Sequence, residues 1–134
     1  MRYLGLDLGT RTLGLSISEG IIANSLKTIR YEKEEDLLSQ LKDIISEYKI
    51  DCLVLGYPKN MNNTIGPRAE MTLEFKTKLE SLGYQVELQD ERLSTVSAHN
   101  IMIEADISRK KRKEKVDALA ATIILQTYLD RKGK

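Results

Sequence analysis

The sequence predicts a single α/β domain, spanning residues 1–134, with a mixed five-stranded sheet flanked by helices. Near the amino terminus, three segments over residues 3–9, 13–18 and 21–29 alternate apolar residues with polar or small ones. This period of two is typical of β-strands, and the short connections between the segments indicate an antiparallel meander. Helical spacing then alternates with short strand patterns, and neither repeats nor linkers interrupt the chain.

The remaining elements are predicted in the order helix, strand, helix, strand, helix, helix, over about 34–48, 52–55, 68–82, 85–89, 94–105 and 112–130. The helices are indicated by apolar residues that recur every three or four positions, as Leu37, Leu41 and Ile44 do. The strand at 52–55 is uniformly apolar, as expected of a strand covered on both faces. Gly83 provides a stop for the second helix.

Composition excludes several classes of protein. No apolar run approaches the ~18 residues that a membrane span needs, and Asp7 interrupts the apolar continuity of a signal peptide. The single cysteine, Cys52, cannot form an intramolecular disulfide or a cysteine-rich zinc site. We therefore expect a protein of the reducing cytoplasm with no membrane partner.

Charge is concentrated in one segment. Residues 109–115 hold six basic side chains and one acidic one, whereas the rest of the chain has 15 basic and 19 acidic residues. A local charge of +5 on a mildly acidic body indicates contact with a polyanion such as nucleic acid. A solvated loop without a partner is the alternative. The residues expected to contact nucleic acid here are Arg109, Lys110, Lys111, Arg112 and Lys113.

Three acidic positions interrupt their local patterns. Asp7 lies inside a strand, on the face that it shares with glycines two residues away on either side, where a ligand can approach. Asp90 and Glu91 fall at the end of the last strand, where open α/β sheets bind ligands. Asp117 lies early in the last helix. Converging carboxylates favour Mg²⁺ or Mn²⁺, and such ions support phosphodiester hydrolysis.

Spacing alone leaves simpler structural roles open for the same acidic residues. Asp7 is also placed to bond the turn at 10–12, and Glu91 to pair with Arg92 or cap the next helix. Asp117 is also a suitable first-turn acid near a helix amino terminus. Arg11, Arg92 and the basic segment are the candidate sources of positive charge for binding phosphates.

Four segments taken together resemble the YqgF (RuvX) family: DLGTRTLG at 7–14, LGYPKNM at 55–61, DERLST at 90–95 and KVDALAA at 115–121. They occur in the family's order, and the similarity spans nearly the whole chain. Members are described as Holliday junction resolvases and as nucleases that mature the 5′ end of pre-16S ribosomal RNA.

The resemblance implies a ribonuclease-H-like fold with three acidic metal ligands, which carry over to Asp7, Glu91 and Asp117. In the related RuvC resolvases the second acid follows the fourth strand; here Gly56 to Pro58 takes that place, and Glu91 is the expected substitute, with Asp90 as its rival.

The function expected is therefore a Mg²⁺- or Mn²⁺-dependent endonuclease on structured nucleic acid. The resemblance favours precursor ribosomal RNA, and with it ribosomal particles as partners, over DNA junctions. Junction cleavage would require a homodimer rather than a monomer. A non-catalytic nucleic-acid-binding or ribosome assembly factor is the alternative from another class, and the retained acids argue against it.

Overall fold

The computed structural model describes residues 1–58, 66–90 and 109–132, with the backbone alone over 109–117. Five strands form one sheet in the order β3-β2-β1-β4-β5. Their bounds are Tyr3–Leu8 for β1, Thr12–Ser18 for β2, Ala23–Arg30 for β3, Cys52–Tyr57 for β4 and Val86–Asp90 for β5. β1, β2 and β3 pair antiparallel, while β1, β4 and β5 pair parallel. The predicted meander with two parallel strands is confirmed.

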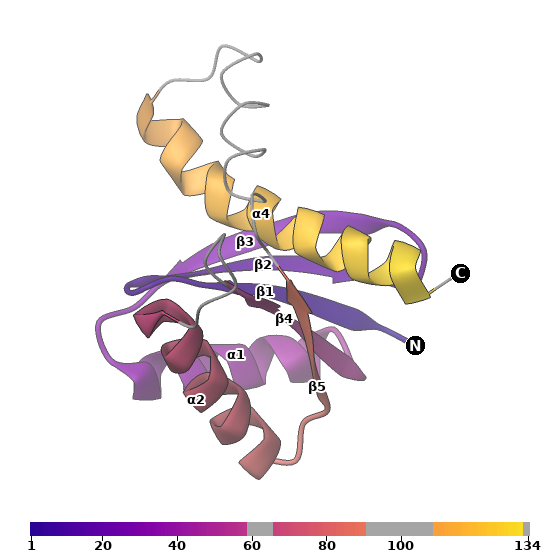
Figure 1. Ribbon diagram of the computed structural model, residues 1–134, viewed down its shortest axis with the longest axis horizontal. Helices are drawn as coiled ribbons and strands as arrows, with labels where there is room; N and C mark the ends of the chain where they lie inside the picture. Colours follow the sequence, from indigo (N-terminus) through magenta and orange to yellow (C-terminus); the bar gives the residue numbers. More distant parts are fainter. Residues whose placement is uncertain (59–65, 91–108, 133–134) are drawn as a thin grey trace.

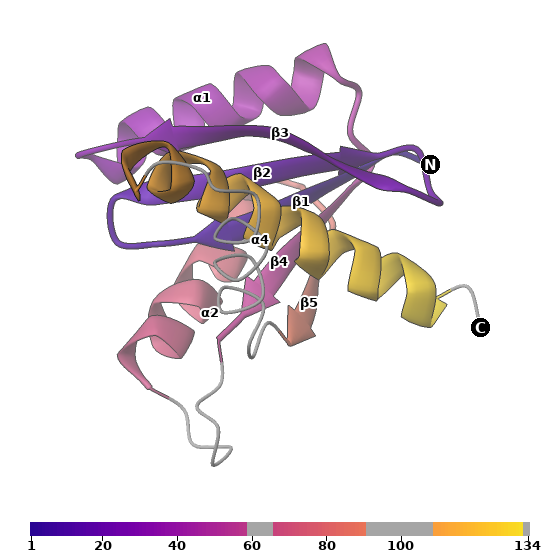
Figure 2. The same ribbon diagram turned by 90° about the horizontal axis from the view of Figure 1, so that it is seen from above.

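Helices cover both faces of this sheet (Figures 1 and 2). The helices are α1 (Glu34–Glu47), α2 (Pro67–Ser81) and α4 (Arg109–Lys132). α1 and α2 lie on one face, and α4 crosses the other, its first turns rising away from the sheet (Figure 1). Within the described residues, no helix is long and apolar enough to cross a membrane.

The apolar core is divided by the sheet into two clusters. The larger one lies between the sheet and the helix pair α1 and α2, and contains alternate residues of β1 such as Leu4 and Leu6 together with Phe75 of α2. The smaller one lies under α4 and includes Tyr3, Val54 and Leu125. Since both faces of β1 are covered, all six of its residues are buried.

The close approach of α4 to the sheet depends on Gly5. A Cβ at this position would lie 2.8 Å from the Cβ of Leu125 and 2.9 Å from the carbonyl oxygen of Ala121. On the neighbouring strand, the Ser16 hydroxyl donates a buried hydrogen bond of 2.8 Å to the same Ala121 carbonyl. A small residue on β1 and a hydroxyl on β2 therefore set the height and the position of α4.

Two predicted boundaries differ from the structure. The last helix begins at Arg109 rather than near residue 112, so the basic segment is helical rather than a loop. The third strand begins at Ala23 rather than Ile21, because the chain turns there and leaves Ile21 and Ile22 exposed. The helix predicted over 94–105 lies outside the described residues.

Candidate active site

The parallel strands bring two of the predicted acidic positions to one edge of the sheet. β1, β4 and β5 run in the same direction, so their carboxyl ends meet there. Asp7 is the next-to-last residue of β1, and Asp90 is the last residue of β5. Asp7 is only 7% exposed, whereas Asp90 is exposed. A buried carboxylate at the end of a central strand is costly unless something nearby compensates its charge.

Glycine flanks Asp7 on both neighbouring strands. Asp7 pairs with Gly14 of β2, and because Leu6 pairs with Leu55 of β4, Gly56 is next to Asp7 in the register. All three residues belong to the α4 face, since Gly5, two positions before Asp7, is packed against that helix. Neither strand beside Asp7 therefore places a side chain next to its carboxylate on this face.

The guanidinium of Arg68, a residue of α2, lies near the Asp7 carboxylate. The Nη2 atom of Arg68 donates a 3.0 Å hydrogen bond to the carbonyl oxygen of Leu8 and lies 3.9 Å from Oδ1 of Asp7. Pro67 begins α2 and places Arg68 in its first turn, so the side chain extends from the helix end to the strand end. Half of the Arg68 side chain is exposed, which leaves part of the guanidinium accessible. No pattern in the sequence singles out Arg68.

Gln89 is a second residue at this edge that no sequence pattern indicates. It pairs with Gly56 and is only 6% exposed. Its Nε2 donates a 3.3 Å hydrogen bond to the Asp90 carbonyl, while its Oε1 is buried without a hydrogen-bond partner in the described part of the chain. Alternation places Val86 and Leu88 in the core and Gln89 on the opposite face. That face is also covered, which the strand pattern of β5 alone does not reveal.

Asp117 lies in α4 one helical turn before Ala121. α4 runs antiparallel to β1, since Tyr128 contacts Tyr3 with ring centroids 6.0 Å apart while Ala121 lies against Gly5. The helix segment that carries Asp117 therefore runs toward the end of β1 that carries Asp7. Asp117 is the ninth residue of α4, whose first turn contains no acidic residue. The alternative reading of Asp117 as a first-turn acid is wrong.

The remaining predicted site residues are only partly described. Glu91 and Arg92 lie outside the described residues, as do the side chains of Asp117 and of the basic segment, residues 109–115, which includes the predicted residues 109–113. Among the side chains that the structure describes, no group of three His, Cys, Asp or Glu residues is placed to hold a metal ion. The three-acid site therefore remains a prediction.

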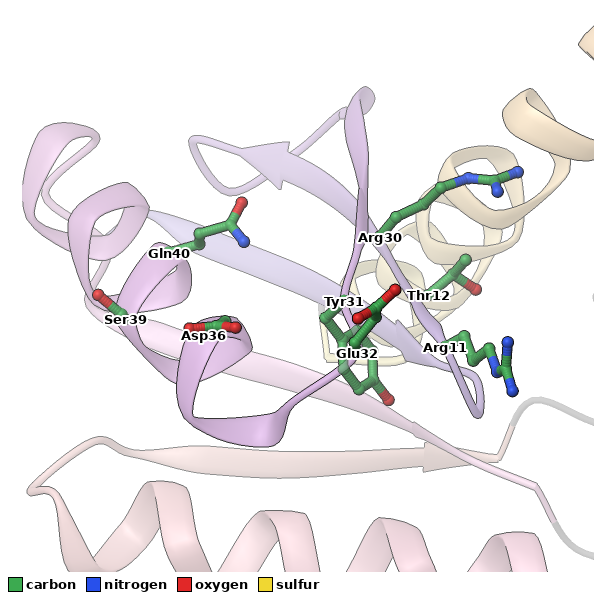
Figure 3. A pocket seen from close by; sticks show the side chains of 8 residues that line it. All are labelled: Arg11, Thr12, Arg30, Tyr31, Glu32, Asp36, Ser39 and Gln40. Atoms are coloured by element: carbon green, nitrogen blue, oxygen red, sulfur yellow. The ribbon is translucent and has the colours of Figure 1, made fainter.

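Arg11 is exposed in the turn between β1 and β2. It borders an open pocket of about 640 Å³, with the turn and the end of β3 on one side and α1 on the other (Figure 3). Tyr31 fixes this turn, because its hydroxyl donates a 2.7 Å hydrogen bond to the Gly9 carbonyl and its amide donates one of 3.0 Å to the Arg11 carbonyl. Burial, and then the charge of Glu34, raises the pKa of the Tyr31 phenol above its ordinary value of 10.0, so the phenol remains a donor to higher pH than usual.

The sheet order, the helix across one face and the carboxylate on the central strand define a ribonuclease-H-like α/β protein. A family model described as "RuvX: Holliday junction resolvase" matches residues 1–131, and the chain belongs to this family. A relative from Geobacillus sp. (strain WCH70), named "Putative pre-16S rRNA nuclease", is 52% identical over 98% of this chain and 99% of its own length. One from Clostridium botulinum (strain Alaska E43 / Type E3), with the same name, is 51% identical over the full length of both.

Solved structures show the same fold at low identity. RuvC from T. thermophilus, in complex with a Holliday junction substrate, has a TM-score of 0.60 and 14% identity over 100% of this chain and 97% of that one. The fowlpox virus Holliday junction resolvase has a TM-score of 0.61 and 12% identity over 98% and 99%. These likenesses confirm the predicted ribonuclease-H-like fold.

Proposed function

We propose that this chain is a metal-dependent endonuclease that cleaves phosphodiester bonds in structured RNA and processes the 5′ end of pre-16S ribosomal RNA. The observation that carries the proposal is the buried Asp7 carboxylate at the end of β1, with glycines beside it on both neighbouring strands. Membership of the RuvX family and the names of relatives about half identical to this chain support the reaction and the substrate.

Asp7, Glu91 and Asp117 would hold Mg²⁺ or Mn²⁺. Carboxylate oxygens are the ligands that these hard ions prefer, and the buried Oε1 of Gln89, which accepts no hydrogen bond in the described part of the chain, adds a neutral oxygen at the same edge. The bound ion would supply a Lewis acid that activates water and stabilises the leaving oxygen. The chain positions the acids on separate elements, β1, the segment after β5, and α4.

Positively charged residues would bind the phosphates on either side of the cleaved bond. Arg68 extends beside Asp7 with half of its side chain exposed. Arg11 lies in the exposed turn that follows β1. Residues 109–113 occupy the first turns of α4, which rise away from the sheet (Figure 1). Together with Arg92, these residues would bind phosphate charge around the acidic edge.

The test is cleavage of precursor ribosomal RNA, free or in ribosomal particles, of single-stranded RNA and of a four-way DNA junction, each with Mg²⁺ or Mn²⁺. Asp7→Asn should abolish cleavage while the protein stays folded. Asp43→Asn, on the exposed surface of α1, is the matched control and should retain full activity. Full activity of Asp7→Asn would contradict the proposal.

Junction cleavage is the second candidate function. It is favoured by the family description and by the resolvases among the structures with the same fold. Preferential cleavage of the four-way junction would support it over RNA processing, and symmetric cuts in two strands would require a homodimer. Binding of RNA by the wild-type protein without cleavage of any substrate would instead indicate an assembly factor.

A further inference from the structure

Gln89 is a neutral amide in a place where an apolar residue would pack without loss. It is only 6% exposed, and its Oε1 accepts no hydrogen bond within the residues that the structure describes. A buried carbonyl oxygen without a partner destabilises the folded state, so its presence in a strand needs a reason. The hydrogen bond from Nε2 to the Asp90 carbonyl fixes the amide and leaves the oxygen as the available atom.

The register places this oxygen two strands from Asp7. Gln89 pairs with Gly56, and Gly56 is next to Asp7. Adjacent strands are about 4.8 Å apart, so the Cα atoms of Asp7 and Gln89 are separated by about 10 Å. Glycine in between leaves this stretch of the face without a side chain from β4.

Gln89 has two ways to act on a bound ion: direct coordination, or a hydrogen bond to one of the waters of the ion. A Cα separation of about 10 Å is within reach of an aspartate and a glutamine side chain in either arrangement, since coordinating oxygens lie about 2.1 Å from Mg²⁺ and a hydrogen bond adds about 2.8 Å. The water-mediated contact is favoured because Mg²⁺ is usually held by one or two carboxylates rather than by a cage of protein oxygens. Mg²⁺ usually keeps several of its waters when it binds to proteins.

We propose that the Gln89 carbonyl oxygen accepts a hydrogen bond from a water in the hydration shell of the ion held by Asp7, an inference that rests on the proposed metal site. Water on a cation points its hydrogens outward, so a carbonyl oxygen, which accepts hydrogen bonds, suits it. Gln89 is thus a positioning residue that orients the hydration shell and strengthens metal binding. Such outer contacts typically contribute 10- to 100-fold to metal affinity.

The test compares Mn²⁺ affinity and metal-free stability in the same variants of the whole protein. Gln89→Leu should lower Mn²⁺ affinity by about 10- to 100-fold, measured by titration calorimetry or by the free-Mn²⁺ resonance signal. Its metal-free Tm should stay close to that of the wild type, because removing a buried oxygen that accepts no hydrogen bond in the described part of the chain offsets the loss of the 3.3 Å hydrogen bond from Nε2 to the Asp90 carbonyl. Gln89→Glu keeps an acceptor, adds charge beside Asp7 and should tighten Mn²⁺ binding.

Glu87→Gln is the matched control. Glu87 pairs with Val54 on the same face of β5, two residues further from the carboxyl edge, and its substitution should change Mn²⁺ affinity less than Gln89→Leu does. Unchanged Mn²⁺ affinity in Gln89→Leu, with normal binding by the wild type, would overturn the inference and leave the proposed function standing. So would a large loss of metal-free Tm, since that would show a structural role. A wild type as unable to bind Mn²⁺ as Asp7→Asn would overturn the proposed metal site itself.

Discussion

Arg68 Nη2 lies 3.9 Å from Asp7 Oδ1, although α2, which carries Arg68, packs on one face of the sheet and the side chain of Asp7 belongs to the other. Asp7 belongs to the face that α4 covers, whereas α2 packs on the other face (Figure 1). Arg68 extends around the end of β1 because Pro67 starts α2 beside that end, and the hydrogen bond to the Leu8 carbonyl holds the guanidinium there. A positive charge is thereby placed beside a carboxylate that is proposed to bind a metal ion.

The loss of stability caused by replacing Arg68 should depend on whether a metal ion is bound. In metal-free protein, Arg68→Gln loses the hydrogen bond to the Leu8 carbonyl and the charge beside Asp7, and the free energy of unfolding should fall by about 1 kcal/mol. With Mn²⁺ bound, the ion supplies positive charge to Asp7, so the loss should be smaller. Urea denaturation with and without Mn²⁺ measures both values. An equal loss in the two conditions would show that Arg68 does not share the carboxylate with the ion.

Arg68→Gln should also slow cleavage, because a guanidinium next to the site contributes to phosphate binding. Arg68→Lys keeps the charge but not the planar geometry of the donors, and it should restore only part of the activity. Cleavage rates at saturating metal give the comparison. Full activity in Arg68→Gln would restrict this residue to a structural role.

Gly5→Ala should displace α4. The added Cβ would meet Leu125 Cβ at 2.8 Å and the Ala121 carbonyl oxygen at 2.9 Å, distances at which the helix must move. Overpacking of this kind typically costs about 1–3 kcal/mol of unfolding free energy. Since α4 also carries Asp117, cleavage should fall together with stability. Gly83→Ala is the contrast, because its Cβ meets nothing within 4 Å and only its backbone, at φ +95°, is strained; it should lose stability without a specific loss of activity in the folded protein.

The helical basic segment predicts the salt dependence of nucleic-acid binding. Replacing Lys110, Lys111 and Arg112 with Ala should weaken binding. Each phosphate contact contributes about 0.7 to 0.9 to the slope of log K against log salt, so the slope should flatten by about 2 to 3. Lys42→Ala, on the exposed surface of α1, is the control and should leave the slope unchanged. The same slope in the triple variant and the wild type would mean that the segment is solvated surface.

Alkaline pH should destabilise the protein through Cys52. Burial, and then the negative charge of Glu87, raises the pKa of this thiol above its ordinary value of 9.0. A folded-state pKa above the unfolded value favours folding at lower pH, and this contribution is lost as the pH rises from 9 through the folded value. The free energy of unfolding should therefore decrease above pH 9, less steeply in Cys52→Ala. If the free energy of unfolding of the two proteins decreases equally at alkaline pH, groups other than Cys52 cause the loss.

The family prediction and the fold are confirmed, whereas the three-acid site stays a prediction. Asp7 could be singled out from the sequence because an acid inside an apolar strand, between glycines, conflicts with its local pattern. Arg68 and Gln89 showed no such conflict. A basic residue in the first turn of a helix is unremarkable, and Gln89 follows the alternation of β5 as an outward polar residue.

The order and type of the described elements were determined by the sequence itself, because hydrophobic period, glycine stops and helix-start acids are properties of neighbouring residues. Tertiary structure alone decided which side chains share the acidic edge. The register between β1, β4 and β5 places Gly56 between Asp7 and Gln89, and the packing of α2 and α4 on opposite faces brings Arg68 to Asp7 and buries Gln89. These neighbours depend on contacts between residues far apart in the chain, and no local sequence pattern indicates such contacts.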